Sequence, residues 1–521
     1  MPASHGIQPE YPGEITQRAD GVNQVASPSR LQIRASTTFS KMTNKVASAF
    51  AWEGSTKLFV QAVAWVSTIW VANLLSPEDY GLVAISGLFT GVLTLVSEFG
   101  IGAGLITRKE VSADEYRRCF WLGILASTLL YGLLFTVAPF IGRAYGISEL
   151  PSIIRVASLG LLISALKIVP YSQVMRALDY RFRALTEMLG QLLQAVSVIV
   201  LAINGFGAWS LVYGYLIGQG VIALVFLSKT ASPWPIGFSL HGLSDLIAFG
   251  TRITGARLLG FFVSTADMLI ISATLGQRAA GLYAVSASLA TAPLDKIGSI
   301  FNRVAFPLVA RMHDEPEKAR QLLSKFHYYL LAIVSPALVG VALTSPEVVA
   351  VLLNSKWADA IDILAILCVG NVVRLSGMML PSILEGLGRA EKVLTYQALS
   401  ALLLPAAFLI GAQWGLRGVA LSWLVIFPMI YLWLVWTTTR ALQMKVSDLL
   451  GRTLPIVLAN LAMAAAVIGA RHFLGDYPLV PRLCALIAVG AAAYLGTLAL
   501  RTPREQRNEA AIFLRSLRSK G

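Results

Sequence analysis

The segment Leu75-Ser-Pro-Glu-Asp-Tyr-Gly-Leu-Val-Ala-Ile-Ser86 joins two apolar runs, and a related segment, Leu275-Gly-Gln-Arg-Ala-Ala-Gly-Leu-Tyr-Ala-Val-Ser286, follows 200 residues later. Five of the twelve paired positions are identical. A weaker echo pairs Gly207 with Gly418. Because six apolar runs separate the two copies, both enter a membrane in the same direction, which predicts two parallel repeats about an axis along the membrane normal. Chance similarity between apolar sequences is the alternative.

The composition indicates that most of the chain lies in a lipid bilayer. Of its 521 residues, 56% are hydrophobic and only 13% are charged, which leaves too little polar surface for a protein in water. Apolar runs of about 18 or more residues predict membrane-spanning helices. We therefore expect an all-α polytopic membrane protein with about fourteen spans, near residues 50–74, 81–106, 119–141, 153–174, 185–203, 209–228, 246–274, 280–303, 327–345, 361–385, 393–411, 418–439, 453–470 and 483–500.

The duplication divides this predicted bundle into two six-helix lobes, with two further helices outside the repeat. One lobe rocking against the other is the motion that alternating access requires. The basic C-terminal tail predicts an amphipathic helix on the cytoplasmic leaflet, with a solvated tail as the alternative. The expected parts are a disordered cytoplasmic tail (1–45), an N-lobe with spans one to six (46–229), a C-lobe with spans seven to twelve (230–440), spans thirteen and fourteen (441–500) and the basic tail (501–521).

The distribution of basic residues between the spans predicts the orientation. The segments on the side that holds both tails carry 28 Lys and Arg, whereas the opposite segments carry only six. Positively charged loops stay in the cytoplasm, so this contrast places both termini there.

Charged residues inside the predicted spans are the candidates for function, because a charge at mid-bilayer is costly unless it faces protein or water. Eight are basic: Lys57, Arg155, Lys167, Arg252, Arg257, Lys296, Arg303 and Arg374. Five are acidic: Glu53, Glu98, Glu187, Asp267 and Asp295. The excess of basic residues favours an anionic substrate.

Helical spacing gathers several of these residues on common faces. Thr254, Arg257, Phe261 and Ser264 follow three- and four-residue steps, with Asp267 close by. Such cations in a low-dielectric cleft attract multivalent anions such as phosphates, and Arg offers forked donors to two oxygens. The predicted binding residues are Arg252, Arg257, Lys296, Arg374, Lys167 and Lys57.

Structural roles for the same residues are the alternative. Lys57, Arg155 and Arg303 lie near predicted helix ends, where a long side chain reaches the interface. Asp295 or Lys296 could instead pair with Arg252 or Asp267 to hold helices together.

Several other classes of function find little support. The net charge of +14 comes without a basic domain interleaved with aromatic residues, which argues against nucleic acid binding. Three scattered cysteines form neither a disulfide framework nor a CxxC metal site. No nucleophile and base set stands out, so we expect no catalytic residue, no metal and no cofactor.

Three motifs resemble the polysaccharide transporter family of the multidrug/oligosaccharidyl-lipid/polysaccharide exporter superfamily, which includes O-antigen and exopolysaccharide flippases. They are Leu75-Ser-Pro-Glu-Asp-Tyr-Gly81, Ser97-Glu-Phe-Gly100 and Glu385-Gly-Leu-Gly-Arg389. The resemblance covers roughly residues 46–440, and the first motif is the most specific. A common form of the second motif has Asp where this chain has Glu98.

The resemblance implies a flippase in a bacterial inner (cytoplasmic) membrane. It would move a polyprenyl pyrophosphate-linked oligosaccharide from the cytoplasmic to the periplasmic leaflet, for lipopolysaccharide, O-antigen or exopolysaccharide biosynthesis. Related lipid II flippases have a cationic central cavity, in keeping with the basic residues above. Membrane lipids, a polysaccharide polymerase and chain-length machinery are the implied partners. Asp267 and Glu98 are candidates for ion coupling, and the membrane potential alone is the other source of direction.

Other functions remain open alternatives. A multidrug or small-solute antiporter of the same superfamily would need an acidic cavity for cationic drugs. A membrane glycosyltransferase or polymerase would need a larger extracytoplasmic domain, since the outer segments are all short. A scaffold for a polysaccharide assembly complex would bind partners without moving substrate.

Overall fold

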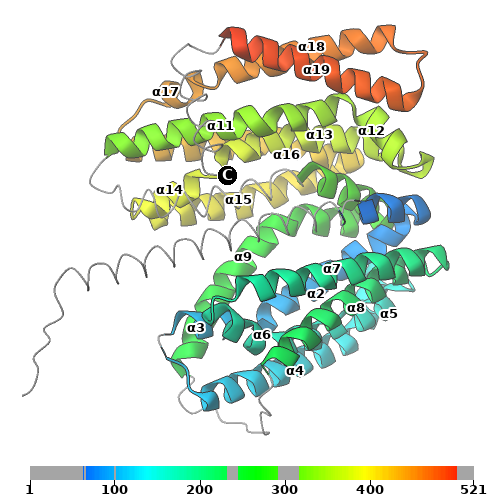
Figure 1. Ribbon diagram of the computed structural model, residues 1–521, viewed down its shortest axis with the longest axis vertical. Helices are drawn as coiled ribbons and strands as arrows, with labels where there is room; N and C mark the ends of the chain where they lie inside the picture. The colour runs from blue at the N-terminus through cyan, green and yellow to red at the C-terminus, as the bar shows by residue number, and fades with distance from the viewer. Residues whose placement is uncertain are drawn as a thin grey trace, which may run out of the picture. The chain divides into compact units, whose positions relative to one another are not determined.

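A computed structural model describes residues 63, 66–98, 101–108, 110–230, 244–291 and 316–501, and every regular element within these ranges is helical (Figure 1). Residues 66–74 and 276–291 are also helical. The remaining elements are α2 (Pro77–Glu98), α3 (Ile101–Thr107), α4 (Ala113–Tyr145), α5 (Leu150–Ala157), α6 (Leu159–Arg176), α7 (Tyr180–Ile203), α8 (Ala208–Lys229), α9 (Ser244–Thr274), α11 (Pro316–Leu343), α12 (Ser345–Leu352), η1 (Ser355–Trp357), α13 (Ala360–Gly377), α14 (Leu380–Gly386), α15 (Ala390–Gly411), η2 (Ala412–Trp414), α16 (Gly415–Ala441), α17 (Val446–Gly451), α18 (Leu454–Phe473) and α19 (Leu479–Arg501).

The described residues contain eleven candidate membrane spans by length and hydropathy, which confirms an all-α polytopic membrane protein. One of the eleven, Ala390–Ala441, contains both α15 and α16. Gly415 separates these two helices with a φ of 72°, a conformation that glycine adopts readily. The predicted first and eighth spans extend outside the described residues, so the count of fourteen stays a prediction, as do the predicted tails.

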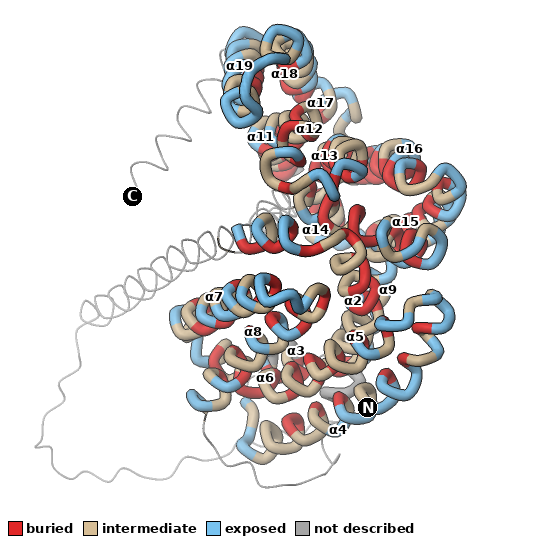
Figure 2. The backbone as a smooth tube through the Cα atoms, turned by 90° about the vertical axis from the view of Figure 1, so that its right-hand side faces the viewer, coloured by how far each residue is buried: buried red, intermediate tan, exposed pale blue. Residues whose placement is uncertain are grey.

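The helices pack in two sets. The first set contains α2 to α8, and the second contains α9, the helix 276–291 and the helices from α11 onward. Helices α2 and α9 contact each other between the sets (Figure 1). Helices α4 to α8 pack on one another, and α13 packs against α11 and α16 in the other set. Many residues of α13 are buried, whereas α18 and α19 expose much of their surface (Figure 2). The exposed side chains on these outer helices are mostly apolar, as expected of surfaces that face lipid.

The C-terminal hairpin of α18 and α19 is attached to α12 by a buried carboxylate. Glu347, which is only 3% exposed, lies 2.7 Å from Nη2 of Arg471 on α18 and 3.1 Å from Nη2 of Arg482 on α19. One buried acid thus connects both helices of the hairpin to α12, and loss of either arginine would leave its charge less compensated.

The two copies of the duplicated segment contact each other reciprocally. A Cβ atom added at Gly81 would overlap the carbonyl oxygen of Gln277, and one added at Gly281 would overlap that of Pro77. These four positions are equivalent in pairs at the repeat offset of 200. Reciprocal contact between equivalent residues is the pattern of an isologous, two-fold contact, and glycine allows the two backbones to approach this closely.

Further polar contacts surround this glycine contact. We call the whole contact region the hairpin seal; in it, residues 72–81 pack against residues 275–281 and 352–359. Arg278 donates to Glu78 at 2.9 Å and to Asp359 at 3.3 Å, and these hydrogen bonds raise the pKa of Arg278 above its ordinary value. Trp357 donates from Nε1 to the carbonyl of Ala72 at 2.9 Å. The seal therefore joins the two helix sets at one end of the bundle.

Candidate functional site

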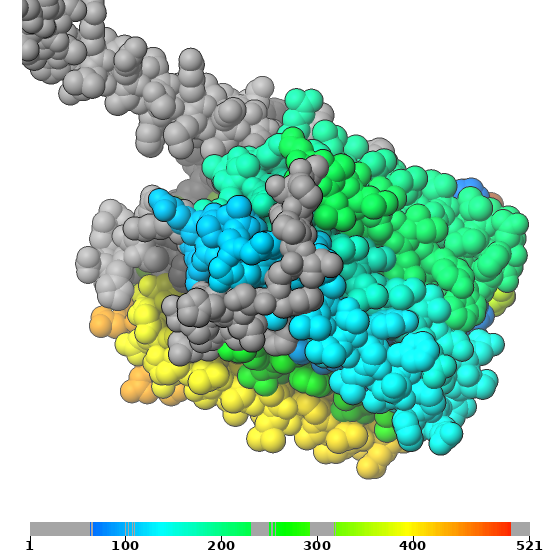
Figure 3. All heavy atoms as spheres, turned by 90° about the horizontal axis from the view of Figure 1, so that it is seen from below, coloured from blue at the N-terminus to red at the C-terminus, as the bar shows by residue number. Residues whose placement is uncertain are grey.

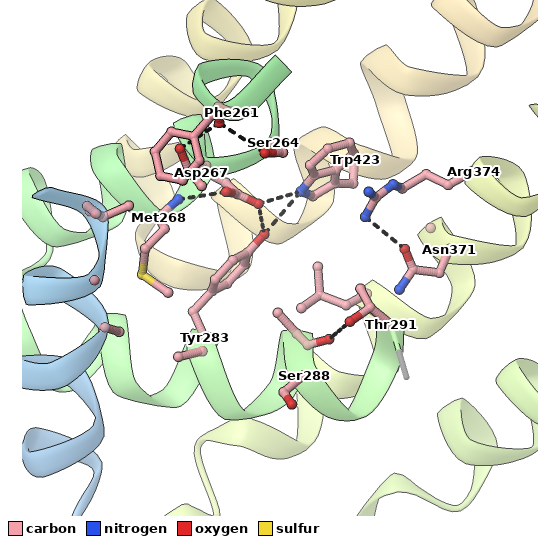
Figure 4. A pocket seen from close by; sticks show the side chains of 18 residues that line it. Phe261, Ser264, Asp267, Met268, Tyr283, Ser288, Thr291, Asn371, Arg374 and Trp423 are labelled. Carbon is pink, nitrogen blue, oxygen red and sulfur yellow. Dashed lines mark hydrogen bonds between the residues drawn. The ribbon is translucent and has the colours of Figure 1, made fainter. Parts of the chain in front are cut away.

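A cavity of about 440 Å³ lies between α2 and the helices α9, 276–291, α13 and α16 (Figure 4). Most of its polar lining comes from the second helix set, whereas α2 contributes small or apolar residues. The lining residues that carry polar side chains are Ser264, Thr265, Asp267, Tyr283, Ser288, Thr291, Asn371, Arg374 and Trp423.

Asp267 is the buried acid of this cavity, and three groups donate to its carboxylate. Tyr283 Oη lies 2.5 Å from Oδ2, Trp423 Nε1 lies 3.3 Å from the same oxygen, and the backbone N–H of Met268 lies 2.7 Å from Oδ1. Trp423 Nε1 is also 3.1 Å from Tyr283 Oη. Figure 4 shows the three side chains converging on one point of the cavity wall.

Arg374 is the cation of this cavity. Its guanidinium carbon lies 4.7 Å from the centre of the Trp423 ring, and its Nη1 donates to Oδ1 of Asn371 at 3.1 Å. Asn371 lies one turn earlier on α13 and in turn donates to the carbonyl of Ala290 at 3.0 Å. Trp423 thus stands between the arginine and the carboxylate, contacting Arg374 with its ring face and Asp267 with its N–H.

A second cavity, of about 320 Å³, adjoins the first and shares Ser264, Thr291, Arg374 and Trp423 with it. It extends along α15 and reaches the break between α13 and α14, where Gly377, Met378 and Pro381 line it. Proline favours an end or break in a helix here, which opens space beside Arg374.

The three- and four-residue steps on α9 place Phe261, Ser264 and Asp267 on the face that lines the first cavity. Arg257 lies one turn before Phe261, and its Nη1 is 3.5 Å from Oε2 of Glu98 on α2. Both side chains of this ion pair are more than a third exposed. The structure therefore joins two residues to which the sequence analysis assigned different roles, anion binding and ion coupling.

Of the other predicted binding residues, only Lys167 has a described side chain. Lys167 on α6 donates to Oε1 of Gln219 on α8 at 2.7 Å, inside the first helix set. Arg252 belongs to α9, but its side chain lies outside the described residues, as do Lys57 and Lys296 entirely. The predicted roles of these four residues stay predictions.

Tyr283, Asn371 and Trp423 were not predicted as site residues, because none of them carries a formal charge that marks it inside a span. One signal was available for Tyr283, which occupies the repeat position of Val83 and so places a phenol where the first copy has an apolar side chain. For Trp423 and Asn371 no such signal exists in one sequence.

The chemistry of the cavity suits binding more than reaction. It offers one guanidinium, one buried carboxylate and several hydroxyl groups. Among the described residues, no group of three His, Cys, Asp or Glu side chains could hold a metal ion.

The fold is similar to those of solved membrane transporters. The lipid II flippase MurJ, in an inward closed conformation, superposes with a TM-score of 0.67 over 89% of this chain and 99% of its own, at 15% identity. An inward-facing multidrug resistance MATE transporter of the MOP superfamily gives a TM-score of 0.57 over 73% of this chain and 95% of its own, at 19% identity. The chain thus has the fold of the MOP membrane transporters.

Within that class, the family model described as "Polysaccharide biosynthesis protein" matches residues 70–362, and the chain belongs to this family. The lipopolysaccharide biosynthesis protein WzxC of Escherichia coli is 25% identical over 73% of this chain and 78% of its own length. The succinoglycan biosynthesis transport protein ExoT of Rhizobium meliloti is 25% identical over 85% and 90%. The teichuronic acid biosynthesis protein TuaB of Bacillus subtilis is 24% identical over 89% and 97%. The chain is therefore a multi-pass membrane transporter of polysaccharide biosynthesis, as the three motifs indicated.

Proposed function

We propose that this protein is a flippase for a polyprenyl pyrophosphate-linked oligosaccharide, which it moves from the cytoplasmic to the periplasmic leaflet by alternating access. The observation that carries the proposal is Arg374, a cation inside a cavity that lies between the two helix sets. Two of its relatives, a lipopolysaccharide biosynthesis protein and a succinoglycan biosynthesis transport protein, support a saccharide substrate.

The surroundings of Arg374 suit a pyrophosphate. The guanidinium lies over the ring of Trp423, and only one of its five N–H groups is needed for the bond to Asn371. The remaining donors can meet two phosphate oxygens at once, in the forked geometry that favours Arg over Lys. Ser264, Ser288 and Thr291 add hydroxyl groups suited to a sugar.

The proposed topology has fourteen spans in two parallel six-helix lobes, with α18 and α19 outside the repeat and both termini in the cytoplasm. The reciprocal glycine contact supports the two-fold relation between the lobes. In that orientation the hairpin seal lies at the periplasmic end and must open to release substrate. An anion moving outward gains about 2.3 kcal/mol per charge per 100 mV, so the membrane potential favours export.

The second candidate is a multidrug or small-solute antiporter, and Asp267 is the observation that favours it. A buried carboxylate in the cavity wall is a feature that a cationic solute or a coupling cation can use. In our proposal Asp267 instead couples substrate movement to a cation gradient. An antiporter would export cationic dyes independently of any lipid-linked saccharide.

The test replaces Arg374 in a strain that lacks the chromosomal copy. We expect Arg374→Gln to slow saccharide export by about 10- to 100-fold, because charge-assisted hydrogen bonds contribute about 1.5–3 kcal/mol each. The deletion strain should accumulate lipid-linked saccharide facing the cytoplasm. A matched control is Arg440→Gln, since Arg440 also stacks on a tryptophan, Trp436 at 5.3 Å, but does not line either polar cavity.

Membrane levels of both variants are measured by immunoblot to separate lost activity from lost protein. Normal polysaccharide output from Arg374→Gln at normal protein level would refute the proposed site. Dye export without any change in lipid-linked saccharide would favour the antiporter.

A further inference from the structure

A third cavity, of about 700 Å³, lies between α2, α4, α9 and α15 and is almost entirely apolar. Among the described residues that line it, Thr265 alone is polar. The apolar residues come from all four helices: Leu88, Phe89, Val92 and Leu93 of α2, Leu133, Leu134, Val137 and Ile141 of α4, Phe261, Phe262, Ala266, Leu269 and Ile270 of α9, and Pro405 and Leu409 of α15. We call it the apolar cavity.

The apolar cavity adjoins the polar cavity that contains Arg374. Leu88, Phe261 and Thr265 line both. The ring of Phe261 packs against α2 at Gly91, where an added Cβ atom would approach it to 3.0 Å. Phe261 therefore forms part of the partition between a polar compartment and an apolar one at the same level of α2 and α9.

The rim of the apolar cavity is open to the surroundings of the bundle. Leu133 and Leu409 are each 54% exposed, and Phe262 is 52% exposed. On the face shown in Figure 3, the bright green of α9 lies between the cyan of α4 and the yellow that includes α15. Because these helices lie in a membrane, exposed apolar side chains at this rim meet lipid chains.

We infer that the apolar cavity holds the isoprenoid chain of the lipid-linked substrate next to its head group, an inference that rests on the proposed function. An amphiphile with an anionic head at Arg374 requires an apolar compartment beside it. A cavity of this volume is in the range of ligand pockets, about 300–1,000 Å³, so it holds one segment of a long chain while the rest stays in the bilayer.

The depth of the apolar cavity within the span favours a lipid-linked saccharide over an ordinary phospholipid as its ligand. The shared residue Leu88 lies at the middle of α2 (Pro77–Glu98), so both cavities meet near the centre of a span. A phospholipid keeps its head group at the bilayer surface, whereas a lipid-linked saccharide that is being moved across brings its head group to this level. Only the second arrangement places a polar head and an apolar chain side by side at mid-span.

Contact between the isoprenoid chain and the apolar cavity serves mainly to position the head group. Lipid tails are as apolar as leucine, so transfer of the chain from bilayer to cavity contributes little hydrophobic free energy. A chain held beside Phe261 instead keeps the head group close to Arg374, which raises its effective concentration there.

The first test uses photo-crosslinking in lipid nanodiscs of phosphatidylethanolamine and phosphatidylglycerol. p-Benzoylphenylalanine replaces Val137 in the cavity lining or, as a control, Leu402, which is 70% exposed on α15 and does not line the cavity. With undecaprenyl pyrophosphate as the probe, we expect adducts at position 137 at least about fivefold above those at 402, and inorganic pyrophosphate should suppress them. Equal yields at the two positions, or phospholipid adducts alone at 137, would overturn the inference.

The second test fills the cavity from its rim. Val137→Trp should weaken binding of undecaprenyl pyrophosphate by about fivefold, because the indole occupies space that the chain needs. Binding of inorganic pyrophosphate should be unchanged, and Leu402→Trp should behave as the unaltered protein. Val137→Ala, which leaves the space open, shows whether position 137 tolerates change.

The outcomes separate the two proposals. If the unaltered protein binds both probes and Val137→Trp binds them equally well, the apolar cavity has no role while the proposed function stands. If the unaltered protein binds neither probe, the proposed function fails first, and the inference with it.

Discussion

At the scale of single residues, the charged side chains of the polar cavity are held in place by contacts with neutral side chains. Tyr283 donates the shortest hydrogen bond to Asp267, and both residues are buried. Tyr283→Phe removes this donor and leaves a carboxylate oxygen with only the longer bond from Trp423. We expect it to destabilise the protein by about 1–3 kcal/mol, the usual penalty for a buried polar group that loses a partner, measured by thermal unfolding in detergent. The control is Tyr213→Phe at an exposed tyrosine of α8; equal melting temperatures for the two variants would contradict the expectation.

Asp267 itself tests the proposed coupling to a cation gradient. Asp267→Asn keeps the volume and an oxygen that can accept from Tyr283 and Trp423, so the fold should persist. The variant removes the negative charge that a coupling cation would meet. In proteoliposomes at a clamped potential, we expect a proton or sodium gradient to stimulate transport in the unaltered protein and not in Asp267→Asn. Equal stimulation in both proteins would exclude Asp267 as the coupling residue, and no stimulation in either would leave the membrane potential as the driving force.

The ion pair between Arg257 and Glu98 offers a third test at this scale. Each partner is more than a third exposed, so the pair should contribute no more than about 1 kcal/mol to stability. Its importance would be to hold α9 against α2 during transport. We expect Arg257→Glu and Glu98→Arg each to reduce the transport rate and the double exchange to restore most of it. Failure of the double variant to recover would instead favour direct substrate binding by Arg257.

At the scale of elements, α2 and the helix 276–291 can cross only where both carry glycine. Gly81→Ala or Gly281→Ala places a Cβ atom on a backbone carbonyl of the opposite helix, which must then move away. Overpacking of this kind costs about 1–3 kcal/mol, enough to shift an equilibrium by about 5- to 150-fold toward a state with the seal open.

The readout for this shift is the labelling rate of Ser86→Cys by a membrane-impermeant maleimide, in a background without Cys119, Cys368 and Cys484. Ser86 is only 1% exposed here, so faster labelling reports opening. Gly132→Ala is the control, because an added Cβ atom at Gly132 meets nothing within 4 Å. Unchanged labelling in the Gly81 and Gly281 variants would show that the glycine contact does not limit opening.

At the scale of the whole molecule, the sequence predicted the helices better than the site. Spans are local, since a run of apolar residues must cross the bilayer wherever it occurs, and the long described helices fall where such runs were found. The short helices α12 and α17 lie between the predicted runs and were not predicted. Asp267 and Arg374 could be selected because a charge within a span needs a reason. The connection of these two residues through Trp423 could not be predicted. It brings together α9, α13 and α16, and Asp267 and Trp423 are 156 residues apart in the sequence. The pairing of Arg257 with Glu98 likewise depends on how α2 and α9 meet, which no local pattern encodes.

The proposed alternating access makes one demand on the molecule as a whole: contacts that close one end must break in every cycle. The ion pair between Arg278 and Glu78, at 2.9 Å, joins the two hairpins of similar sequence and is exposed enough for reagents to reach it. We therefore expect Glu78→Cys with Arg278→Cys, bridged by a short bis-methanethiosulfonate reagent in the cysteine-free background, to stop transport almost completely. Reduction of the bridge should restore it, since the two side chains are needed only as attachment points. Each single cysteine variant treated with the same reagent controls for modification alone. Transport that continues through the bridged protein would mean that the two repeats do not separate at this end, and substrate would have to leave by another route.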